Sequence, residues 1–324
     1  MTSPIALITG ISGQDGSYLA ELLLARGYTV HGVVRRSSGY GLERIAHLVG
    51  DGEDCPGQVR LHHGDLEDTG RLITLLARVA PDEIYHLAAQ SDVHTSFELP
   101  EHTGSITGLG TTRMLEALRI TGLPARFYQA SSSEMFGASN PPQDEQTPFR
   151  PRSPYAAAKL YGYWTARGYR EAYGLHVVNG IMFNHESPRR GRDFVTRKIA
   201  RAAARIARGE QQLLYLGNLD ARRDWGYAPE YVEAMWRMLQ RPEPEDYVVA
   251  TGTSHSVRDF TELCFGHVDL DWEAHVRVDE RWLRPADVSE LVGDASKARR
   301  DLGWQPTTFA PDLARLMTQA EIDG

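Results

Sequence analysis

Tyr155 and Lys159 are the two side chains whose types and spacing point most directly to chemistry. They lie four residues apart in a segment with a helical pattern, which puts them on one face of the expected helix. An ammonium close to a phenol lowers the pKa of the phenol, so that the phenolate can accept a proton near neutral pH. The pair therefore predicts proton transfer. The plainer alternative is an amphipathic tyrosine beside a surface lysine.

A carboxylate and three hydroxyls follow the apolar run Arg126–Ala130, in the order Ser131, Ser132, Ser133 and Glu134. A carboxylate next to a proton-accepting tyrosine suits an elimination. It can remove a carbon-bound proton and then protonate a leaving hydroxyl. The alternative is a glutamate that caps a helix or is paired inside the core.

A glycine-rich turn follows the first apolar run, Ile5–Thr9, and precedes a helical pattern. Glycines three residues apart allow a tight turn and a close approach of the backbone to a pyrophosphate, whose charge then faces the helix N-terminus. We expect a dinucleotide site here, with a ligand-free turn as the alternative. Its candidate residues are Gly10, Ile11, Ser12, Gly13, Gln14, Asp15 and Gly16.

Arg35, Arg36, Ser37 and Ser38 follow the second apolar run, Tyr28–Val34. An acidic residue there would bond the ribose of NAD, whereas guanidinium and hydroxyl groups suit the 2′-phosphate of NADP. The sequence favours NADP over NAD, and the alternative is a solvated basic loop. Further cofactor candidates follow the third and fourth apolar runs: Asp65, Leu66, Leu87, Ala88, Ala89, Gln90 and Ser91.

Elements that would position these residues alternate along the first half of the chain. Short apolar runs between helical patterns predict a parallel α/β sheet covered on both faces. The expected strands are Ile5–Thr9, Tyr28–Val34, Val59–His63, Glu83–Leu87, Arg126–Ala130, His176–Phe183, Leu213–Leu216 and Tyr247–Ala250. The expected helices are Ser17–Arg26, Thr69–Val79, Ser105–Thr121, Tyr155–Tyr173, Pro229–Leu239, Val257–Phe265 and part of Asp294–Met317.

Length and composition exclude several classes of protein. The chain has 324 residues, 41% of them hydrophobic and 24% charged, as in an ordinary globular protein. Its two cysteines, Cys55 and Cys264, argue against a disulfide scaffold or a metal site and favour the cytoplasm. No apolar run reaches membrane-spanning length. The net charge of −8 is unlike that of a general nucleic-acid binder.

The glycine turn, the serines and the Tyr-x-x-x-Lys pattern together resemble the short-chain dehydrogenase/reductase superfamily. Longer motifs resemble its GDP-mannose 4,6-dehydratase family over nearly the whole chain. Glu134 stands where sugar epimerases of the superfamily carry small residues. The motifs cover residues 6–20, 35–38, 127–131, 151–155, 183–191, 194–198, 217–226 and 284–285.

This resemblance implies that Ser132, Glu134, Tyr155 and Lys159 are catalytic, and it adds His185 and Arg190 to the cofactor site. Arginine and lysine suit a diphosphate because they bring charge and several N–H donors. Arg201, Arg205 and Arg208 are instead expected on a solvated helix face. The residues implied to hold a nucleotide-sugar are Ser91, Asn184, Val195, Lys198, Gly217, Arg223, Arg284 and Asp287.

The resemblance also implies a Rossmann-type, doubly wound parallel sheet with a smaller, interleaved α/β substrate-binding domain. We expect the NADP-binding domain in residues 1–183 with a later segment near 215–252, and the substrate domain mostly in 184–324. The expected assembly is a homodimer or homotetramer. The expected reaction converts GDP-D-mannose to GDP-4-keto-6-deoxy-D-mannose by internal hydride transfer through bound NADP.

Other interpretations remain open at this point. One is a dehydratase, epimerase or reductase of another nucleotide sugar, such as GDP-heptose, on the same scaffold. The other is a non-catalytic NADP-binding regulatory protein. The sequence departs from the family at Ser132 (usually threonine), His102 (usually tyrosine) and Asp287 (usually glutamate), in the loop 39–41, and in a shorter segment before Arg284.

Overall fold

The computed structural model describes residues 3–36, 41–49, 58–283 and 286–324. The chain forms two compact units. Unit 1 comprises Met1–Met135, Ser153–Ile181 and Val232–Tyr247, and unit 2 comprises Phe136–Arg152, Met182–Tyr231 and Val248–Gly324. The segment Phe136–Arg152, expected within the first domain, therefore groups with unit 2. The assignment of cofactor and nucleotide-sugar to separate domains stays a prediction.

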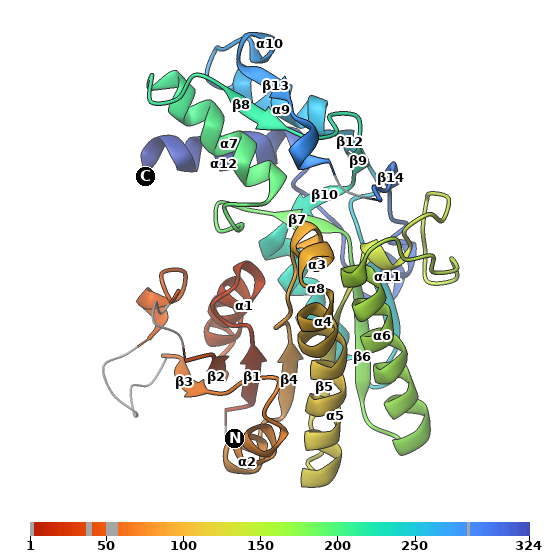
Figure 1. The fold of residues 1–324 in the computed structure, drawn as a ribbon. Coiled ribbons are helices and arrows are strands. Elements are labelled where there is room, and N and C mark those ends of the chain that lie inside the picture. Colours follow the sequence, from red (N-terminus) through yellow and green to blue (C-terminus); the bar gives the residue numbers. More distant parts are fainter. Residues whose placement is uncertain (1–2, 37–40, 50–57, 284–285) are drawn as a thin grey trace. The chain divides into compact units, whose positions relative to one another are not determined.

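A seven-stranded sheet organises unit 1, with the strand order β11-β6-β5-β4-β1-β2-β3 (Figure 1). The pairs β1–β2, β1–β4, β2–β3 and β4–β5 are parallel. The expected doubly wound α/β sheet is confirmed, and its strand order reverses between β1 and β4, where such sheets bind ligands. The strands are β1 (Ile5–Thr9), β2 (Thr29–Val34), β3 (Arg60–His63), β4 (Glu83–His86), β5 (Arg126–Ser132), β6 (Val177–Met182) and β11 (Asp246–Val249).

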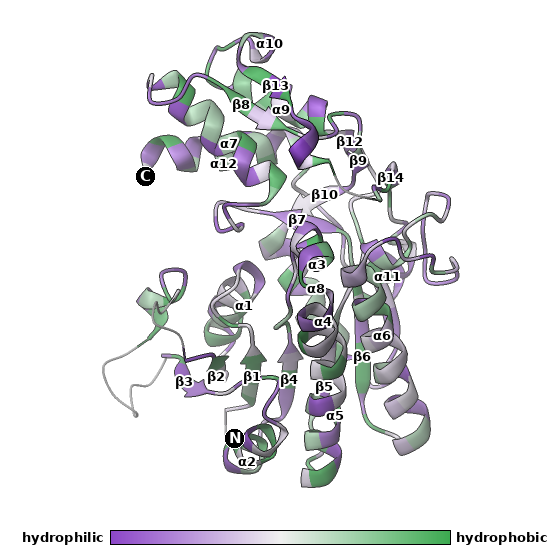
Figure 2. Cartoon of the chain, in the orientation of Figure 1, coloured by the Kyte–Doolittle hydropathy of each residue, from purple (hydrophilic) through white to green (hydrophobic). Residues whose placement is uncertain are grey.

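Helices α2, α5 and α6 pack on one face of this sheet, over a core that includes Leu7, Leu76, Leu115 and Phe127. Near-continuous apolar strands are what a sheet buried on both faces requires, and Figure 2 shows β1 and β6 towards the hydrophobic end of the scale. The helices of this part are α1 (Gln14–Ala25), α2 (Thr69–Val79), α3 (Val93–Glu98), α4 (Pro100–Thr103), α5 (Gly110–Thr121), α6 (Pro154–Tyr173) and α8 (Ala228–Gln240).

The helix expected over Ser105–Thr121 is not regular. Gly104–Leu109 forms a π-helical turn, and the α-helix α5 starts only at Gly110. A π-helical turn inserts an extra residue per turn and redirects the side chains on it, a feature frequent at functional sites. Periodicity alone does not distinguish this turn from an ordinary helix.

Three small sheets and a helical cluster make up unit 2. Helices α7, α9 and α12 pack together around residues such as Ile199, Phe260 and Met317. The sheets are β10-β7, β12-β9-β14 and β13-β8. Their strands are β7 (Asn184–Glu186), β8 (Leu214–Leu216), β9 (Arg222–Arg223), β10 (Trp225–Tyr227), β12 (His255–Ser256), β13 (Val276–Val278) and β14 (Glu290–Leu291). Its helices are α7 (Val195–Ala207), α9 (Val257–Gly266), α10 (Trp272–His275), α11 (Ser296–Leu302) and α12 (Ala310–Asp323).

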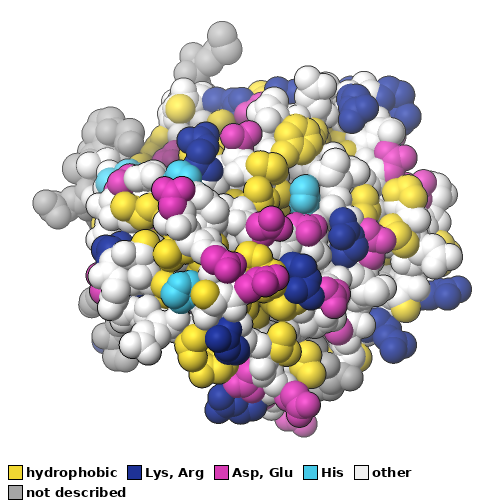
Figure 3. Space-filling view, turned by 90° about the horizontal axis from the view of Figure 1, so that it is seen from above, with side chains coloured by type: hydrophobic (Ala, Val, Ile, Leu, Met, Phe, Trp, Pro, Cys, Tyr) yellow, Lys and Arg dark blue, Asp and Glu magenta, His cyan; other side chains and the backbone are white. Residues whose placement is uncertain are grey.

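Charges of both signs share the surface seen in Figure 3, where arginine and lysine side chains are interspersed with aspartate and glutamate. The net charge of −8 is therefore not gathered into one acidic patch on that face. Within the described ranges, no helix is both long and apolar enough to cross a bilayer.

Candidate active site

The turn after β1 is tight and presses against the end of β4. Gly10 has a φ of +74°, and a Cβ at this position would stand 2.9 Å from the backbone nitrogen of Ala88. The Gly13 N–H donates to the Gly10 carbonyl at 3.0 Å. Any side chain at Gly10 would strain the backbone and strike the neighbouring segment. The first glycine of the motif is therefore required by geometry.

Helix α1 starts directly after this turn, with Gly13 as its N-cap residue and no side-chain cap. A Cβ at Gly16 would stand 2.4 Å from the Gly10 carbonyl oxygen. The first N–H groups of a helix lack intrahelical partners and attract an anion. Only glycine permits this close packing of the turn against the start of a 12-residue helix, and such a turn lets the backbone approach the pyrophosphate of a dinucleotide. Ile11, Ser12, Gln14 and Asp15 complete this stretch, with Ile11 and Gln14 buried.

The segment Leu87–Ser91 after β4 is held by threonines. The Ala88 N–H donates to Thr9 Oγ1 at 3.2 Å, and the Gln90 N–H donates to Thr107 Oγ1 at 3.1 Å. Thr107 belongs to the π-helical turn, and the sequence reasoning did not identify it. The Oε1 atom of Gln90 is buried without a hydrogen-bond partner among the described residues. Buried acceptors are normally satisfied, so this orphaned atom also fits a bound ligand.

Residues after β2 and β3 occupy the same carboxyl edge of the sheet, because both strands run parallel to β1. Arg35 and Arg36 directly follow β2 and are exposed. Asp65 is half-buried and Leu66 is buried after β3. The hydroxyls predicted at residues 37 and 38 lie outside the described residues.

Ser132 and Glu134 are buried where β5 ends, each with an exposed fraction of 9%. Ser132 is the last residue of β5, and Glu134 lies in the single 3-10 turn that follows, Ser133–Met135. The Glu134 N–H donates to Ser132 Oγ at 3.2 Å. A hydroxyl and a carboxylate are thereby fixed next to each other at the strand end.

Tyr155 and Lys159 occupy the first two turns of α6 and are also buried, with exposed fractions of 8% and 5%. The Lys159 ammonium is 5.8 Å from the centroid of the Tyr155 ring and donates to the Ala130 carbonyl at 2.8 Å. Ser153 caps the helix through its side chain. The bond to Ala130 joins α6 to β5, so the structure brings the tyrosine–lysine and serine–glutamate pairs together within unit 1.

The cation of Lys159 is electrostatically costly in this position. Burial lowers the pKa of Lys159 to about 8, and the charge of Asp15 opposes that shift. Burial, together with the Lys159 charge, lowers the pKa of His86 to about 3. The histidine is therefore neutral at physiological pH, while Lys159 stays mostly protonated at pH 7 and titrates in the mildly alkaline range.

A buried polar network supports α6 from behind. Asp246 of β11 accepts from Arg170 of α6 through both carboxylate oxygens, at 2.8 and 3.1 Å. It also accepts from the Tyr163 hydroxyl at 3.0 Å and from Asn179 Nδ2 at 3.0 Å. The Ser131 hydroxyl donates to Asn179 Oδ1 at 3.1 Å. The sequence reasoning missed Asn179 and Asp246. In the sequence they are visible only as two polar residues within otherwise apolar strands.

His185 and Arg190, the cofactor candidates of unit 2, each contact other side chains of that unit. His185 sits on β7 and stacks on Tyr231, with ring centroids 4.7 Å apart. Arg190 Nε is 3.0 Å from Glu186 Oε2, and its guanidinium lies 3.8 Å from the Phe194 ring centroid. Both side chains are therefore held in place by their own unit.

Arg223 and Asp287, two of the nucleotide-sugar candidates, form an ion pair with 3.2 Å between Nη2 and Oδ1. Arg223 is buried and also donates to the Val288 carbonyl at 2.8 Å. The other oxygen of Asp287 accepts from Asn218 Nδ2 at 3.2 Å. Asn184 begins β7, which pairs with β10 just after Arg223.

Lys198 and Gly217 meet at a residue that the sequence reasoning did not name, Trp282. The Lys198 ammonium lies 3.4 Å from the Trp282 ring centroid. A Cβ at Gly217 would stand 2.4 Å from the Trp282 carbonyl oxygen. Val195 is the first residue of α7, one turn before Lys198. Arg284 lies outside the described residues, and Ser91 is exposed.

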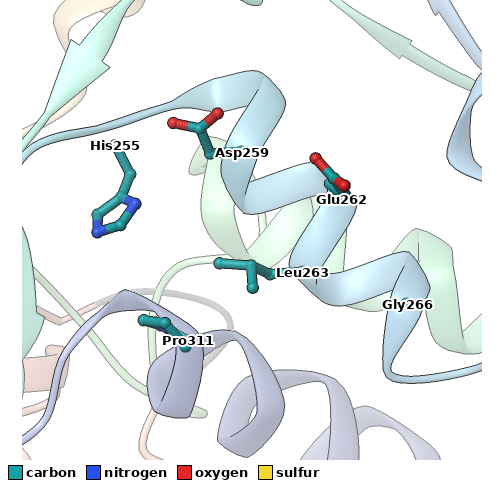
Figure 4. A pocket seen from close by; sticks show the side chains of 6 residues that line it. All are labelled: His255, Asp259, Glu262, Leu263, Gly266 and Pro311. Atoms are coloured by element: carbon teal, nitrogen blue, oxygen red, sulfur yellow. The ribbon is translucent and has the colours of Figure 1, made fainter.

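A shallow depression elsewhere in unit 2 is lined by α9 and by Pro311 of α12 (Figure 4). Asp259 and Glu262 of α9 give it two carboxylates, and the His255 ring lies on the Asp259 side. Carboxylates repel a diphosphate, so we do not assign the site here. In the part of the chain that the structure describes, no three His, Cys, Asp or Glu side chains come together as a metal site.

Comparisons with known proteins find relatives that match nearly the whole chain. The family described as GDP-mannose 4,6 dehydratase matches residues 7–317. GDP-mannose 4,6 dehydratase 1 of Arabidopsis thaliana is 52% identical over 98% of this chain and 90% of its own. Among solved structures, RMD from Pseudomonas aeruginosa complexed with NADPH has a TM-score of 0.81 at 25% identity, covering 99% of both chains. The Thermus thermophilus UDP-glucose 4-epimerase complexed with NAD has a TM-score of 0.84 at 27% identity, covering 98% of both.

Proposed function

The chain belongs to the GDP-mannose 4,6-dehydratase family, a branch of the extended short-chain dehydrogenases/reductases, and we propose how its own residues carry out that family's reaction. It is a hydro-lyase that converts GDP-mannose to the 4-keto-6-deoxy sugar nucleotide. One observation supports the roles proposed below. Four side chains are buried together on two adjoining elements, the end of β5 and the start of α6: Ser132, Glu134, Tyr155 and Lys159.

The dinucleotide is NADP, held at the glycine turn with its 2′-phosphate near Arg35. Support comes from the glycine cradle, the two exposed arginines after β2 and the NADPH named with the Pseudomonas structure. Bound there, NADP would supply a hydride acceptor for carbon 4 of the sugar and, once reduced, a hydride donor for carbon 6. Asp65, Leu66, the 87–91 segment, His185 and Arg190 complete this proposed site.

Tyr155 removes the proton of the sugar 4-hydroxyl and returns a proton to carbon 5 when hydride reaches carbon 6. The Lys159 ammonium, fixed by the Ala130 carbonyl, stabilises the phenolate form by its charge. Since this cation is shielded from water, its field at the phenol is stronger than that of an exposed lysine.

Glu134 removes the carbon-5 proton once carbon 4 has become a ketone, because the carbonyl acidifies that position. The same carboxylic acid then protonates the 6-hydroxyl, which leaves as water, and the Ser132 hydroxyl assists by hydrogen bonding. A buried site also keeps the unsaturated ketone intermediate from water. The nucleotide portion is held by Asn184, Val195, Lys198, Gly217, Arg223, Arg284 and Asp287.

Mass spectrometry of the reaction with GDP-mannose tests this division. Wild type is expected to produce a sugar nucleotide lacking one water, with no net accumulation of NADPH. Glu134→Gln should lose at least about 10²-fold in kcat, as is usual for a positioned acid–base group, while still binding NADP. Glu262→Gln, an exposed glutamate of the depression in Figure 4, should retain activity. Near-normal dehydration by Glu134→Gln would refute its role.

The assembly is a homo-oligomer, built on exposed hydrophobic residues of α5 and α6. Tyr161, Trp164 and Tyr173 of α6 are 47%, 53% and 55% exposed, and Ile120 of α5 is 53% exposed. Large apolar side chains gathered on adjacent helices mark an interaction surface. We place the reaction in the cytoplasm, which the low cysteine content supports.

A further inference from the structure

Lysine is rare in this chain. Only Lys159, Lys198 and Lys297 occur, although lysine and arginine together number 35. Arginine is thus the usual cation here, and a lysine marks a position where a compact ammonium is needed instead of a planar guanidinium. Lys159 has such a role in the proposed chemistry. Lys198 is the second lysine placed in a predicted site, and its surroundings in unit 2 are specific.

The ammonium of Lys198 lies over an aromatic face. Its nitrogen is 3.4 Å from the centroid of the Trp282 ring, well inside the range of a cation–π contact. Burial lowers the pKa of Lys198, which the charges of Asp279 and Asp193 oppose. Even so, the Trp282 residue is 50% exposed. The indole is thus held on one face while much of its surface remains open to solvent.

Two parallel strand ends position this indole. β8 and β13 are paired with Leu216 opposite Val278, so Gly217 and the 279–282 turn leave the same edge. The Asp279 N–H donates to the Leu216 carbonyl at 2.9 Å. Because a Cβ at Gly217 would collide with the Trp282 backbone, only glycine permits this close approach.

We propose that the open face of Trp282 is a stacking platform for the purine base of the nucleotide-sugar, with Lys198 fixing the indole from the opposite face. This inference rests on the proposed function and adds a specificity-determining residue to it. An indole already immobilised loses little side-chain freedom when a base stacks on it. Its bicyclic surface matches a purine better than a pyrimidine. Besides its place in the nucleotide site, Gly217 then admits the Trp282 backbone.

Calorimetric titration of the holoprotein with GDP tests the platform. Trp282→Leu should weaken GDP binding about tenfold or more, the usual consequence of removing one base-stacking aromatic. It should also raise the KM for GDP-mannose while leaving kcat nearly unchanged, because stacking acts equally in the ground and transition states. Trp272→Leu is the matched control, since this indole of the same unit also pairs with a cation, Arg258, at 5.6 Å.

A second variant distinguishes loss of the stacking face from misfolding of Trp282→Leu. Trp282→Phe keeps an aromatic face and should bind GDP nearly as wild type does. GDP should quench part of the tryptophan emission of the wild type, and Trp282→Phe should lack that quenching. The platform is refuted if Trp282→Leu binds GDP within about twofold of wild type, a change too small for a lost stack, or if the quenching persists unchanged in Trp282→Phe.

Failure of the platform and failure of the proposed function are distinguishable. If wild type dehydrates GDP-mannose and Trp282→Leu leaves GDP affinity unchanged, only the platform is wrong. If wild type turns over no nucleotide hexose, the proposed function is wrong. If wild type does not bind GDP, the platform is overturned as well.

Discussion

Burial of the Lys159 ammonium destabilises the folded protein. Its pKa falls from 10.5 to about 8 on burial, and a shift of that size corresponds to roughly 3 kcal/mol against the charged form. The hydrogen bond to the Ala130 carbonyl offsets about 1 kcal/mol of this. Residues retained at a cost to the fold are those that function requires.

Replacing Lys159 by methionine should therefore separate stability from activity. Lys159→Met is expected to abolish dehydration and to raise the free energy of unfolding by about 1–2 kcal/mol at pH 7. Between pH 8 and 10.5 the unfolded chain binds more protons at this residue than the folded chain does. Wild-type stability should rise across that window, and the variant should lack the rise. Urea unfolding of the cofactor-free proteins at several pH values measures both effects. A less stable Lys159→Met at pH 7 would contradict this account.

Residue types with unusual chemistry were the ones that sequence reasoning could place. Tyr155, Lys159, Ser132 and Glu134 stand at strand and helix ends, where their spacing or their position after an apolar run is visible. Trp282 could not be found in this way, because its partners Lys198 and Gly217 are far from it in sequence. Such a contact depends on strand pairing between β8 and β13, which no local pattern encodes.

Two glycines in the elements that carry the site differ in whether they can accept a side chain. A methyl group at Gly16 would collide with the Gly10 carbonyl, whereas a methyl group at Gly168 meets nothing within 4 Å on the exposed side of α6. The same chemical change should therefore act in opposite directions at these two positions.

Gly16→Ala is expected to weaken NADPH binding at least tenfold, which is about 1.4 kcal/mol. Gly168→Ala should leave binding unchanged and raise the free energy of unfolding by roughly 0.5–1 kcal/mol, because alanine restricts the unfolded chain and suits a helix. Fluorescence titration with NADPH and urea unfolding check the two variants. Equal NADPH affinity in Gly16→Ala and wild type would show that the turn does not approach the pyrophosphate.

Asp246 links β11 to α6, the helix that carries Tyr155 and Lys159. Asp246→Ala would leave the Arg170 guanidinium without its carboxylate, and such a loss costs about 3–5 kcal/mol. Burial alone would raise the pKa of Asp246, but Arg170 and the other donors outweigh it and leave the pKa lowered. The stabilisation is present at neutral pH and is lost on acidification, below the ordinary carboxyl range near pH 4.

Chemical unfolding at pH 7 and at pH 3 measures the difference in free energy of unfolding between wild type and Asp246→Ala. We expect this difference to be smaller at pH 3. The control is Asp312→Ala, which removes an exposed pair with Arg315 at 3.5 Å and should cost less than about 1 kcal/mol. If Asp246→Ala lost as little stability as Asp312→Ala, the Asp246 network would not be what holds α6 in place.

At the element scale, prediction succeeded where periodicity decides and failed where tertiary contacts do. The expected strand at Ile5–Thr9 has the same bounds as β1, and the helix Thr69–Val79 the same bounds as α2. The π-helical turn at Gly104–Leu109 has an ordinary helical sequence pattern, and what distinguishes it is Thr107 reaching the Gln90 backbone. The grouping of Phe136–Arg152 with unit 2 likewise leaves no local signal.

At the scale of the whole molecule, the exposed face of α5 and α6 predicts self-association. Trp164→Glu places a charge on that face and should lower the solution mass from at least two chains towards one, as measured by light scattering after gel filtration. Tyr215→Glu, which changes a 43% exposed residue of β8 in unit 2, should leave the mass unchanged. A monomeric wild type would disprove the proposed assembly.

The strand order of the large sheet determines when its edge can close during synthesis on the ribosome. β6 ends at Met182, but its outer neighbour β11 begins only at Asp246. A nascent chain that has emerged through residue 231 therefore presents β6 as an open edge, to which a strand of another chain can add. A stall or premature stop within that interval leaves a fragment with this open edge, so the intervening segment must emerge before the sheet can close it.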